Sequence, residues 1–315
     1  MAKNWYLLAA GLVLGAAPAA ASSLFISPTF DSTITGDPNA TAIETTINNV
    51  IDIYESTFSN PITVDITFGE MSSGLGESEW NYFVGVPYSA YCADLVATSA
   101  IAAATLSPCG ADNPVTGSDS INVKTVDANA VGLTGASGSG TILLNTSLTT
   151  PGSPGSSDQY SLAAVAEHEI DEVLGLGSGL ANTSSGTVTT IDANGDPFPE
   201  DLFRFSAPGA RSFNAGTSCG SLGGAYFSID GGTTNLDGFN NVCNGGDFGD
   251  WVVNSPAQVQ DYAATPGSNP TLGVEITALE AIGYDLSAPE PSTFVLVGTA
   301  LLGTALLSRR LAVRQ

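Results

Sequence analysis

The stretch AEHEIDEVLG, residues 166–175, decides the local fold and contains His168, the single histidine of the chain. Ser161 is a suitable N-cap residue before it, and apolar side chains recur through residues 162–174 at helical spacing. Gly175 follows the last apolar residue, where glycine commonly ends a helix. The sequence therefore predicts a helix over residues 162–174.

The acidic side chains of this helix fall on different faces. His168 and Glu172 are four residues apart, so both project from the same side. Glu169 lies on the apolar stripe, where burial of a carboxylate is costly unless a metal, a partner or a reaction retains it. Glu167 and Asp171 lie opposite the stripe and are expected to be solvated.

The spacing of His168, Glu169 and Glu172 resembles the His-Glu-x-x-His motif of zinc peptidases, with glutamate at the fifth position. In such sites the first and fifth residues bind the metal and the second is the base. The resemblance implies His168 and Glu172 as ligands of one divalent metal and Glu169 as the catalytic base. Zinc is the expected metal. Manganese and iron remain alternatives because carboxylate oxygens are harder ligands than imidazole nitrogens. The alternative is a surface helix with an incidental histidine and clustered acids.

The surroundings of the helix resemble the metzincin-like peptidases. A predicted strand at 141–148, a loop and an Ala-rich helix follow one another, and a helix at 40–58 precedes a strand at 62–68. A bacterial group of exported predicted metalloproteases with Glu at the fifth position has similar phrases. These phrases are DLFRFS (201–206), YFSIDGG (226–232), GDFGDW (246–251) and AIGYD (281–285).

The resemblance implies an α+β fold, a metzincin-like zinc-peptidase domain over residues 22–286. Residues 22–180 are expected to form a helix and sheet half with a mixed sheet and the active-site helix. Residues 181–286 are expected to form an irregular, β-rich half. Further helices are predicted at 88–106 and 275–282. Substrate is expected to lie extended along an edge strand near 141–148.

Two parts of the metzincin pattern are missing. The third ligand of that family would fall at Ser178, and Met1 and Met71 leave no methionine for the turn below the metal. Without a second histidine the third ligand must be a carboxylate, and Asp201 is expected because it opens the phrase 201–206. The reserve candidates are Asp192, Asp196 and Glu200.

Two further features carry open alternatives. Arg204 is expected to support a site carboxylate or bind a substrate carboxylate, or else to form a structural salt bridge. The segment DANGD, residues 192–196, alternates oxygen ligands around a turn glycine, which makes calcium a second cofactor candidate. The same residues are common in ordinary turns, and the distal glutamate of an EF-hand is missing.

The N-terminus has the pattern of a cleaved signal peptide, residues 1–21. Lys3 precedes a short apolar run at 5–17, and small residues at 19–21 suit signal peptidase. The alternative, a membrane-spanning helix, needs a longer apolar run.

The C-terminus combines the triad Pro289-Glu290-Pro291, an uncharged apolar stretch at 292–308 and the basic residues Arg309 and Arg310. This order resembles the PEP-CTERM sorting signal of Gram-negative bacteria, over residues 287–315. The resemblance implies recognition by an exosortase and a transmembrane helix at about 292–308. The protein would be anchored in the inner membrane and then reach the cell surface or medium after processing. The alternative is a plain tail anchor.

Charge restricts the classes of binding partner, and the cysteine content predicts disulfides. The chain has 7 basic and 31 acidic residues, which argues against nucleic acid and anionic lipid. Four cysteines in an exported chain allow three pairings, and the local one is expected: Cys92 with Cys109 and Cys219 with Cys243. A zinc–cysteine site is disfavoured because no pair is closely spaced.

These observations predict an exported, envelope-anchored or surface-released metal-dependent endopeptidase that acts on protein or peptide. The alternative is a non-catalytic surface or extracellular-matrix protein that retains the same fold.

Overall fold

The computed structural model describes residues 23–135, 138–154, 156–182, 186–219 and 223–287. The expected signal peptide, 1–21, and the expected membrane helix, 292–308, lie outside these residues. Within the described part of the chain, no helix is long and apolar enough to cross a membrane.

A four-stranded mixed sheet forms the base of the molecule. Its strand order is β1 (Phe25–Phe30), β2 (Thr63–Glu70), β6 (Gly138–Leu144) and β3 (Gly76–Trp80). The first three strands run parallel, and β3 pairs antiparallel with β6. The expected mixed sheet is thereby confirmed.

The edge strand differs from the expectation. Residues 141–144 belong to β6, which lies between β2 and β3 and is therefore an internal strand. The edge on this side is β3, residues 76–80, whose sequence GESEW has no apolar alternation that would mark a strand.

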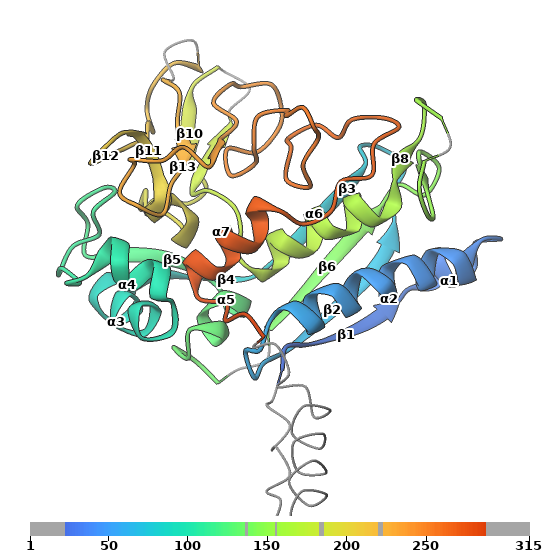
Figure 1. Cartoon of the computed structure of the whole chain (residues 1–315), viewed down its shortest axis with the longest axis horizontal. Helices are drawn as coiled ribbons and strands as arrows, with labels where there is room; N and C mark the ends of the chain where they lie inside the picture. The colour runs from blue at the N-terminus through green and yellow to red at the C-terminus, as the bar shows by residue number, and fades with distance from the viewer. Residues whose placement is uncertain (1–22, 136–137, 155, 183–185, 220–222, 288–315) are drawn as a thin grey trace, which may run out of the picture.

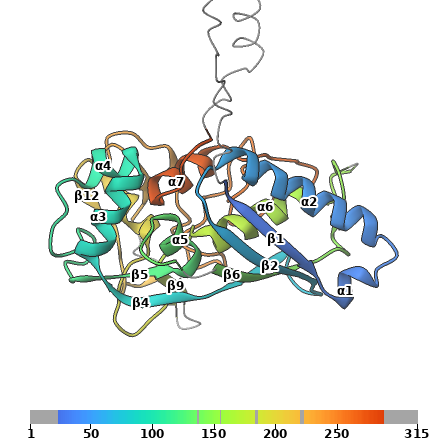
Figure 2. The same ribbon diagram turned by 90° about the horizontal axis from the view of Figure 1, so that it is seen from below.

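Helices α2 (Ala40–Thr57) and α6 (Leu162–Leu174) pack against each other and cover one face of this sheet (Figure 2). Both were predicted with nearly these bounds. The stripe Ile43, Ile47, Val50 and Tyr54 is buried, as the helical spacing of these residues predicts.

The predicted single helix at 88–106 is instead two helices, α3 (Tyr88–Thr98) and α4 (Ala100–Leu106). Ser99 between them has an extended backbone (φ −100°, ψ 117°), and its side chain accepts a hydrogen bond from the Ala102 amide. Serine therefore acts as an N-cap that starts a new helix. The other helices of the described residues are α1 (Ser32–Thr35), α5 (Thr125–Ala130), α7 (Val274–Ile282) and the 3-10 helix η1 (Pro199–Phe203).

The remaining strands are short, and most lie in the C-terminal half (Figure 1). They are β4 (Tyr82–Pro87) with β5 (Ser120–Lys124), β7 (Thr149–Thr150) with β8 (Tyr160–Ser161), β9 (Leu180–Asn182) with β10 (Val188–Thr190), and the sheet β12 (Ala210–Arg211), β11 (Arg204–Ala207), β13 (Tyr226–Phe227), β14 (Asp237–Gly238).

Both expected disulfides are confirmed: Cys92 pairs with Cys109 and Cys219 with Cys243. The first lies in the main hydrophobic core, which runs from the sheet through α2, α6 and α7. The second belongs to a small separate core with Leu180, Val188 and Phe248.

Candidate metal centre

Helix α6 carries the candidate site, and both ends of this helix are well defined. The Ser161 side chain caps the first turn by accepting a hydrogen bond from the Ala164 amide, at 3.2 Å. Gly175 ends the helix with a φ of 151°, a conformation that side chains strongly disfavour.

Three side chains converge above α6: His168, Glu172 and Asp250. His168 Nε2 lies 3.7 Å from Glu172 Oε1 and 3.8 Å from Asp250 Oδ1, and one ligand atom from each residue lies within 4.8 Å of the others. Among the described residues this is the one such group of histidine, cysteine and acidic side chains. Sequence reasoning placed His168 and Glu172 together but missed Asp250.

The chemistry of this donor set fits a single divalent ion. Ligand atoms about 2.0–2.2 Å from a tetrahedral zinc lie roughly 3.3–3.6 Å apart, so the two distances from His168 Nε2, 3.7 and 3.8 Å, lie close to those of a metal site. His168 Nδ1 lies 3.0 Å from the Val259 carbonyl oxygen, so Nδ1 carries the proton and Nε2 keeps its lone pair for a ligand. Oxygen and imidazole donors suit zinc, manganese and iron.

The edge strand holds Glu172 from the other side. Ser78 Oγ, on β3, donates a hydrogen bond to Glu172 Oε2. The other carboxylate oxygen, Oε1, remains turned toward His168. The serine therefore fixes the rotamer that points one oxygen at the proposed ion.

Lys124 is a buried cation next to the backbone of Glu172. Its ammonium donates to the backbone carbonyls of Glu172, at 2.7 Å, and Leu176, at 2.5 Å. It also lies 3.9 Å from the centroid of the Trp80 ring. Burial lowers the pKa of Lys124 to about 8, against the attraction of Glu172. Lys124 thus joins the last turn of α6 to the edge strand.

Glu169, the expected base, is buried beside the edge strand, with 5% of its surface exposed. Its carboxylate lies so close to Gly76 that a Cβ on that residue would overlap Oε1. Burial, then repulsion from Glu172, raises the pKa of Glu169 well above 4.5, while His168 opposes the shift. The apolar stripe thus does bury a carboxylate, as the sequence predicts.

Asp201 does not join the candidate centre, which corrects the expected third ligand. Its Oδ1 accepts a hydrogen bond from Ser178 Oγ at 2.6 Å, and its Oδ2 accepts from the amides of Gly179 and Phe198. These bonds hold the turn after α6 against η1. The reserve candidate Glu200 likewise accepts from the Gly177 amide.

Glu167 and Asp171 are buried rather than solvated, which corrects a second expectation. Tyr54 Oη, on α2, donates to the Glu167 backbone carbonyl at 2.8 Å and to Asp171 Oδ1 at 2.7 Å. Burial raises the pKa of Glu167 to about 8 and that of Asp171 well above 3.8, and Glu275 adds to both shifts. Helix α6 has no solvated face here because α2 covers it.

Arg204 is buried and donates hydrogen bonds to the Phe248 carbonyl and to Asn241 Oδ1, at 2.8 Å for the latter. Its guanidinium carbon lies 4.4 Å from the centroid of the Phe239 ring. Arg204 therefore supports the backbone that leads to Asp250.

The residues considered for calcium have other partners. Asp192 accepts hydrogen bonds from the Gly195 amide and Asn122 Nδ2, and Asp196 accepts from Ser118 and Ser120. These bonds tie the 192–196 turn to the segment at 118–122.

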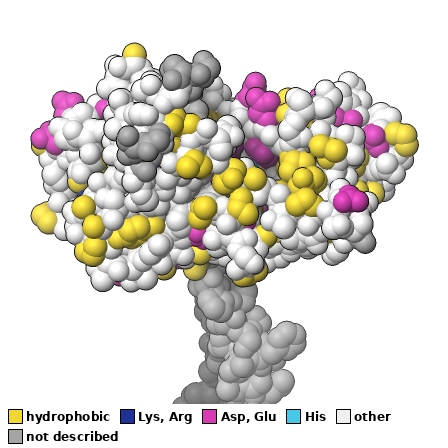
Figure 3. Space-filling view, turned by 90° about the horizontal axis from the view of Figure 1, so that it is seen from above, with side chains coloured by type: hydrophobic (Ala, Val, Ile, Leu, Met, Phe, Trp, Pro, Cys, Tyr) yellow, Lys and Arg dark blue, Asp and Glu magenta, His cyan; other side chains and the backbone are white. Residues whose placement is uncertain are grey.

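Two cavities flank the centre. One, of about 870 Å³, is lined by Ser78, Trp80, Glu172 and Asp247 among others. The other, of about 330 Å³, is lined by Gly76, His168 and Glu169 with Tyr262, and Gly245 borders both. On the face in Figure 3, acidic side chains lie in a hollow, and no Lys or Arg of the described residues is seen there.

The family model described as the PEP-CTERM protein-sorting motif matches residues 287–310. The predicted sorting signal is thus confirmed. The motif is recognised by exosortase and indicates an exported protein. No curated protein and no solved structure matches the chain.

Proposed function

We propose that this protein is a metal-dependent endopeptidase that works outside the cytoplasm. One observation carries the proposal: His168, Glu172 and Asp250 converge next to the buried carboxylate of Glu169, between two cavities along an edge strand. A buried, desolvated acid beside a potential metal group in a cleft marks a candidate functional site, and metal-assisted hydrolysis is one of the reaction classes that it suits. The metzincin-like resemblance of the sequence supports the same reading.

A divalent ion held by His168, Glu172 and Asp250 would supply Lewis-acid activation of water and of the peptide carbonyl. Glu169 would accept the proton of the attacking water and then deliver it to the leaving amine. The raised pKa of Glu169 favours proton acceptance. The positive charge of the bound ion would favour the ionised form of Glu169 that a base requires. Val259 would keep the His168 ring in one tautomer through Nδ1.

The edge strand β3 would bind the substrate backbone. An extended polypeptide added to this edge completes backbone hydrogen bonds that an edge strand leaves open. Its residues Gly76 and Ser78 touch Glu169 and Glu172, so the added chain would pass across the centre. Side chains on either side of the cleaved bond would enter the two cavities.

The sorting signal sets where this activity would act. We further propose that residues 292–308 hold the chain at the inner membrane until the exosortase-type machinery processes it at the PEP-CTERM motif. The peptidase would then work at the cell surface or in the medium.

The test is hydrolysis of an unstructured protein such as casein by the purified chain. Wild type and Glu169→Gln are compared, with bound metal quantified in each. Cleavage that is lost in a Glu169→Gln protein with unchanged metal supports the peptidase and the base. Stoichiometric metal without cleavage of casein or a peptide library favours the non-catalytic surface or matrix protein.

A further inference from the structure

Asp250 lies between two buried aromatic anchors. Trp251, on one side, is fully buried in the main core, and its indole Nε1 donates to Glu275 Oε1 at 3.1 Å. Phe248, on the other side, is buried in the small separate core with Leu180 and Val188. The position of Asp250 therefore depends on both cores, and the second one is small.

The disulfide Cys219–Cys243 belongs to that small core, packed against its buried members together with Phe213. Small hydrophobic clusters contribute little stability alone, so a covalent link has a large relative effect on their order. The disulfide is thus the covalent restraint at the start of the segment that leads from Cys243 to Asp250.

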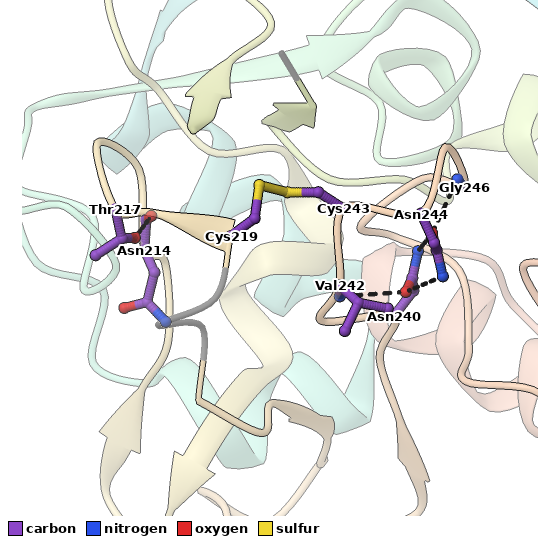
Figure 4. Close-up of a disulfide and its surroundings, with 8 residues drawn as sticks. All are labelled: Asn214, Thr217, Cys219, Asn240, Val242, Cys243, Asn244 and Gly246. Carbon is purple, nitrogen blue, oxygen red and sulfur yellow. Dashed lines mark hydrogen bonds between the residues drawn. A yellow bond between two sulfur atoms is a disulfide. The ribbon is translucent and has the colours of Figure 1, made fainter. Parts of the chain in front are cut away.

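Polar contacts pass this restraint along the segment. Figure 4 shows Cys243 in a loop where the side chains of Asn240, before it, and Asn244, after it, hydrogen-bond each other. Asn244 Oδ1 also accepts from the Gly246 amide at 3.0 Å. The Asn240 side chain also donates to the Asp247 backbone carbonyl at 3.0 Å, and the backbone amide of Asn240 donates to the Asp250 backbone carbonyl at 2.7 Å.

A close backbone contact holds the loop of residues 243–250 against the turn after α6. A Cβ on Gly249 would lie 2.5 Å from the Gly177 Cα, which belongs to the turn after α6. Glycine at 249 therefore lets the loop lie directly on this turn, one residue before Asp250. A shift of the loop away from α6 would carry Asp250 away from His168 and Glu172.

We propose that the Cys219–Cys243 disulfide is a positioning element for Asp250, and that its reduction weakens metal binding. The inference rests on the metal site proposed above. A dithiol reductant would give two electrons and two protons, so that the S–S bond breaks, two cysteine thiols form and the dithiol becomes a disulfide. Both Cys219 and Cys243 are only partly buried, so a reductant can reach them.

The second disulfide provides a matched control. Cys92 is fully buried on α3 in the main core, and it pairs with Cys109, which follows α4 and is partly buried against that core. Loss of this bond lowers general stability without touching the segment 243–250. Exposed disulfides also reduce first, so mild treatment is expected to open Cys219–Cys243 and leave Cys92–Cys109 intact.

The experiment measures affinity for Zn²⁺ and the absorption spectrum of bound Co²⁺ in the full chain. Wild type is compared with Cys219→Ser/Cys243→Ser, with Cys92→Ser/Cys109→Ser, and with Phe248→Ala, which removes the one aromatic side chain among the buried members of the small core but keeps the disulfide. Wild type reduced mildly, alkylated and freed of reagents is the fourth sample, with the modified cysteines identified by mass. All are measured well below their melting temperatures.

We expect zinc affinity to fall about 10–100-fold, with an altered cobalt spectrum, in the Cys219/Cys243 variant, in Phe248→Ala and in the alkylated protein. The Cys92/Cys109 variant should stay within about threefold of wild type. Wild-type affinity and spectrum in a folded Cys219/Cys243 variant would overturn the inference, as would equal losses in both double variants. If wild type itself binds no metal, the proposed function fails first.

Discussion

Replacement of Gly76 by alanine tests how closely the edge strand and the base are fitted. The added Cβ would overlap Glu169 Oε1 and would lie 2.8 Å from both Glu169 Cδ and Val165 Cγ1. Ordinary contact begins near 3.4 Å, so the Glu169 carboxylate must move by about 0.6 Å or more. The strand itself is paired along its whole length with β6 and resists the alternative shift.

The size of the effect follows from that displacement. Misplacement of a catalytic group by about 1 Å costs on the order of 100-fold in rate. We therefore expect kcat to fall roughly 10–100-fold in Gly76→Ala. Metal content should be unchanged, because Glu169 is the base and not a ligand in this account.

The assay is peptide hydrolysis, with metal content and melting temperature measured on the same samples. Gly224→Ala is the control, since a Cβ there meets no atom within 4 Å. A folded Gly76→Ala protein with wild-type kcat would refute the fit between β3 and Glu169. Loss of metal together with activity would show that Glu169 is a ligand instead.

Three other predictions concern stability. Tyr54→Phe removes the donor to Asp171 and should lower the free energy of unfolding by about 1–3 kcal/mol in urea titrations; no change would mean that Asp171 has another sufficient partner. Burial raises the pKa of Asp127 well above 3.8, against the Tyr91 hydrogen bond, so its contribution to stability is present at acidic pH and is lost as pH rises through the raised value. The free energy of unfolding of Asp127→Asn should therefore rise relative to that of wild type from about pH 4 upward. A difference in free energy of unfolding that does not change with pH would contradict this. Chelation of the metal should lower the melting temperature and zinc should restore it, since ligand at 100 times Kd adds about 2.7 kcal/mol; a melting temperature insensitive to both would argue against the ion.

Local signals in the sequence predicted helix α6 well. Ser161 and Gly175 mark its ends, and α2 was visible from the spacing of its apolar residues. The position of Glu169 on a buried stripe also follows from helical geometry alone. These features depend on neighbours within a few residues, which is why a single sequence reveals them.

Long-range contacts account for the parts that the sequence did not predict. Asp250 reaches His168 because the loop after Cys243 packs on the turn that follows α6, whereas Asp201 was favoured by the phrase that it opens. The solvated face assigned to Glu167 assumed that one side of the helix meets water, but Tyr54 of α2 lies against it. A signal for Asp250 was present in the phrase GDFGDW, which the resemblance had already singled out.

The most direct test of the account is the zinc content of three purified proteins: wild type, Asp250→Asn and Asp201→Asn, each shown to be folded. The account predicts about one zinc per chain in wild type and in Asp201→Asn. It predicts that Asp250→Asn loses more than about 100-fold in zinc affinity, since even supporting residues cost 10–100-fold. Full zinc in Asp250→Asn, with zinc lost from a folded Asp201→Asn, would contradict the site.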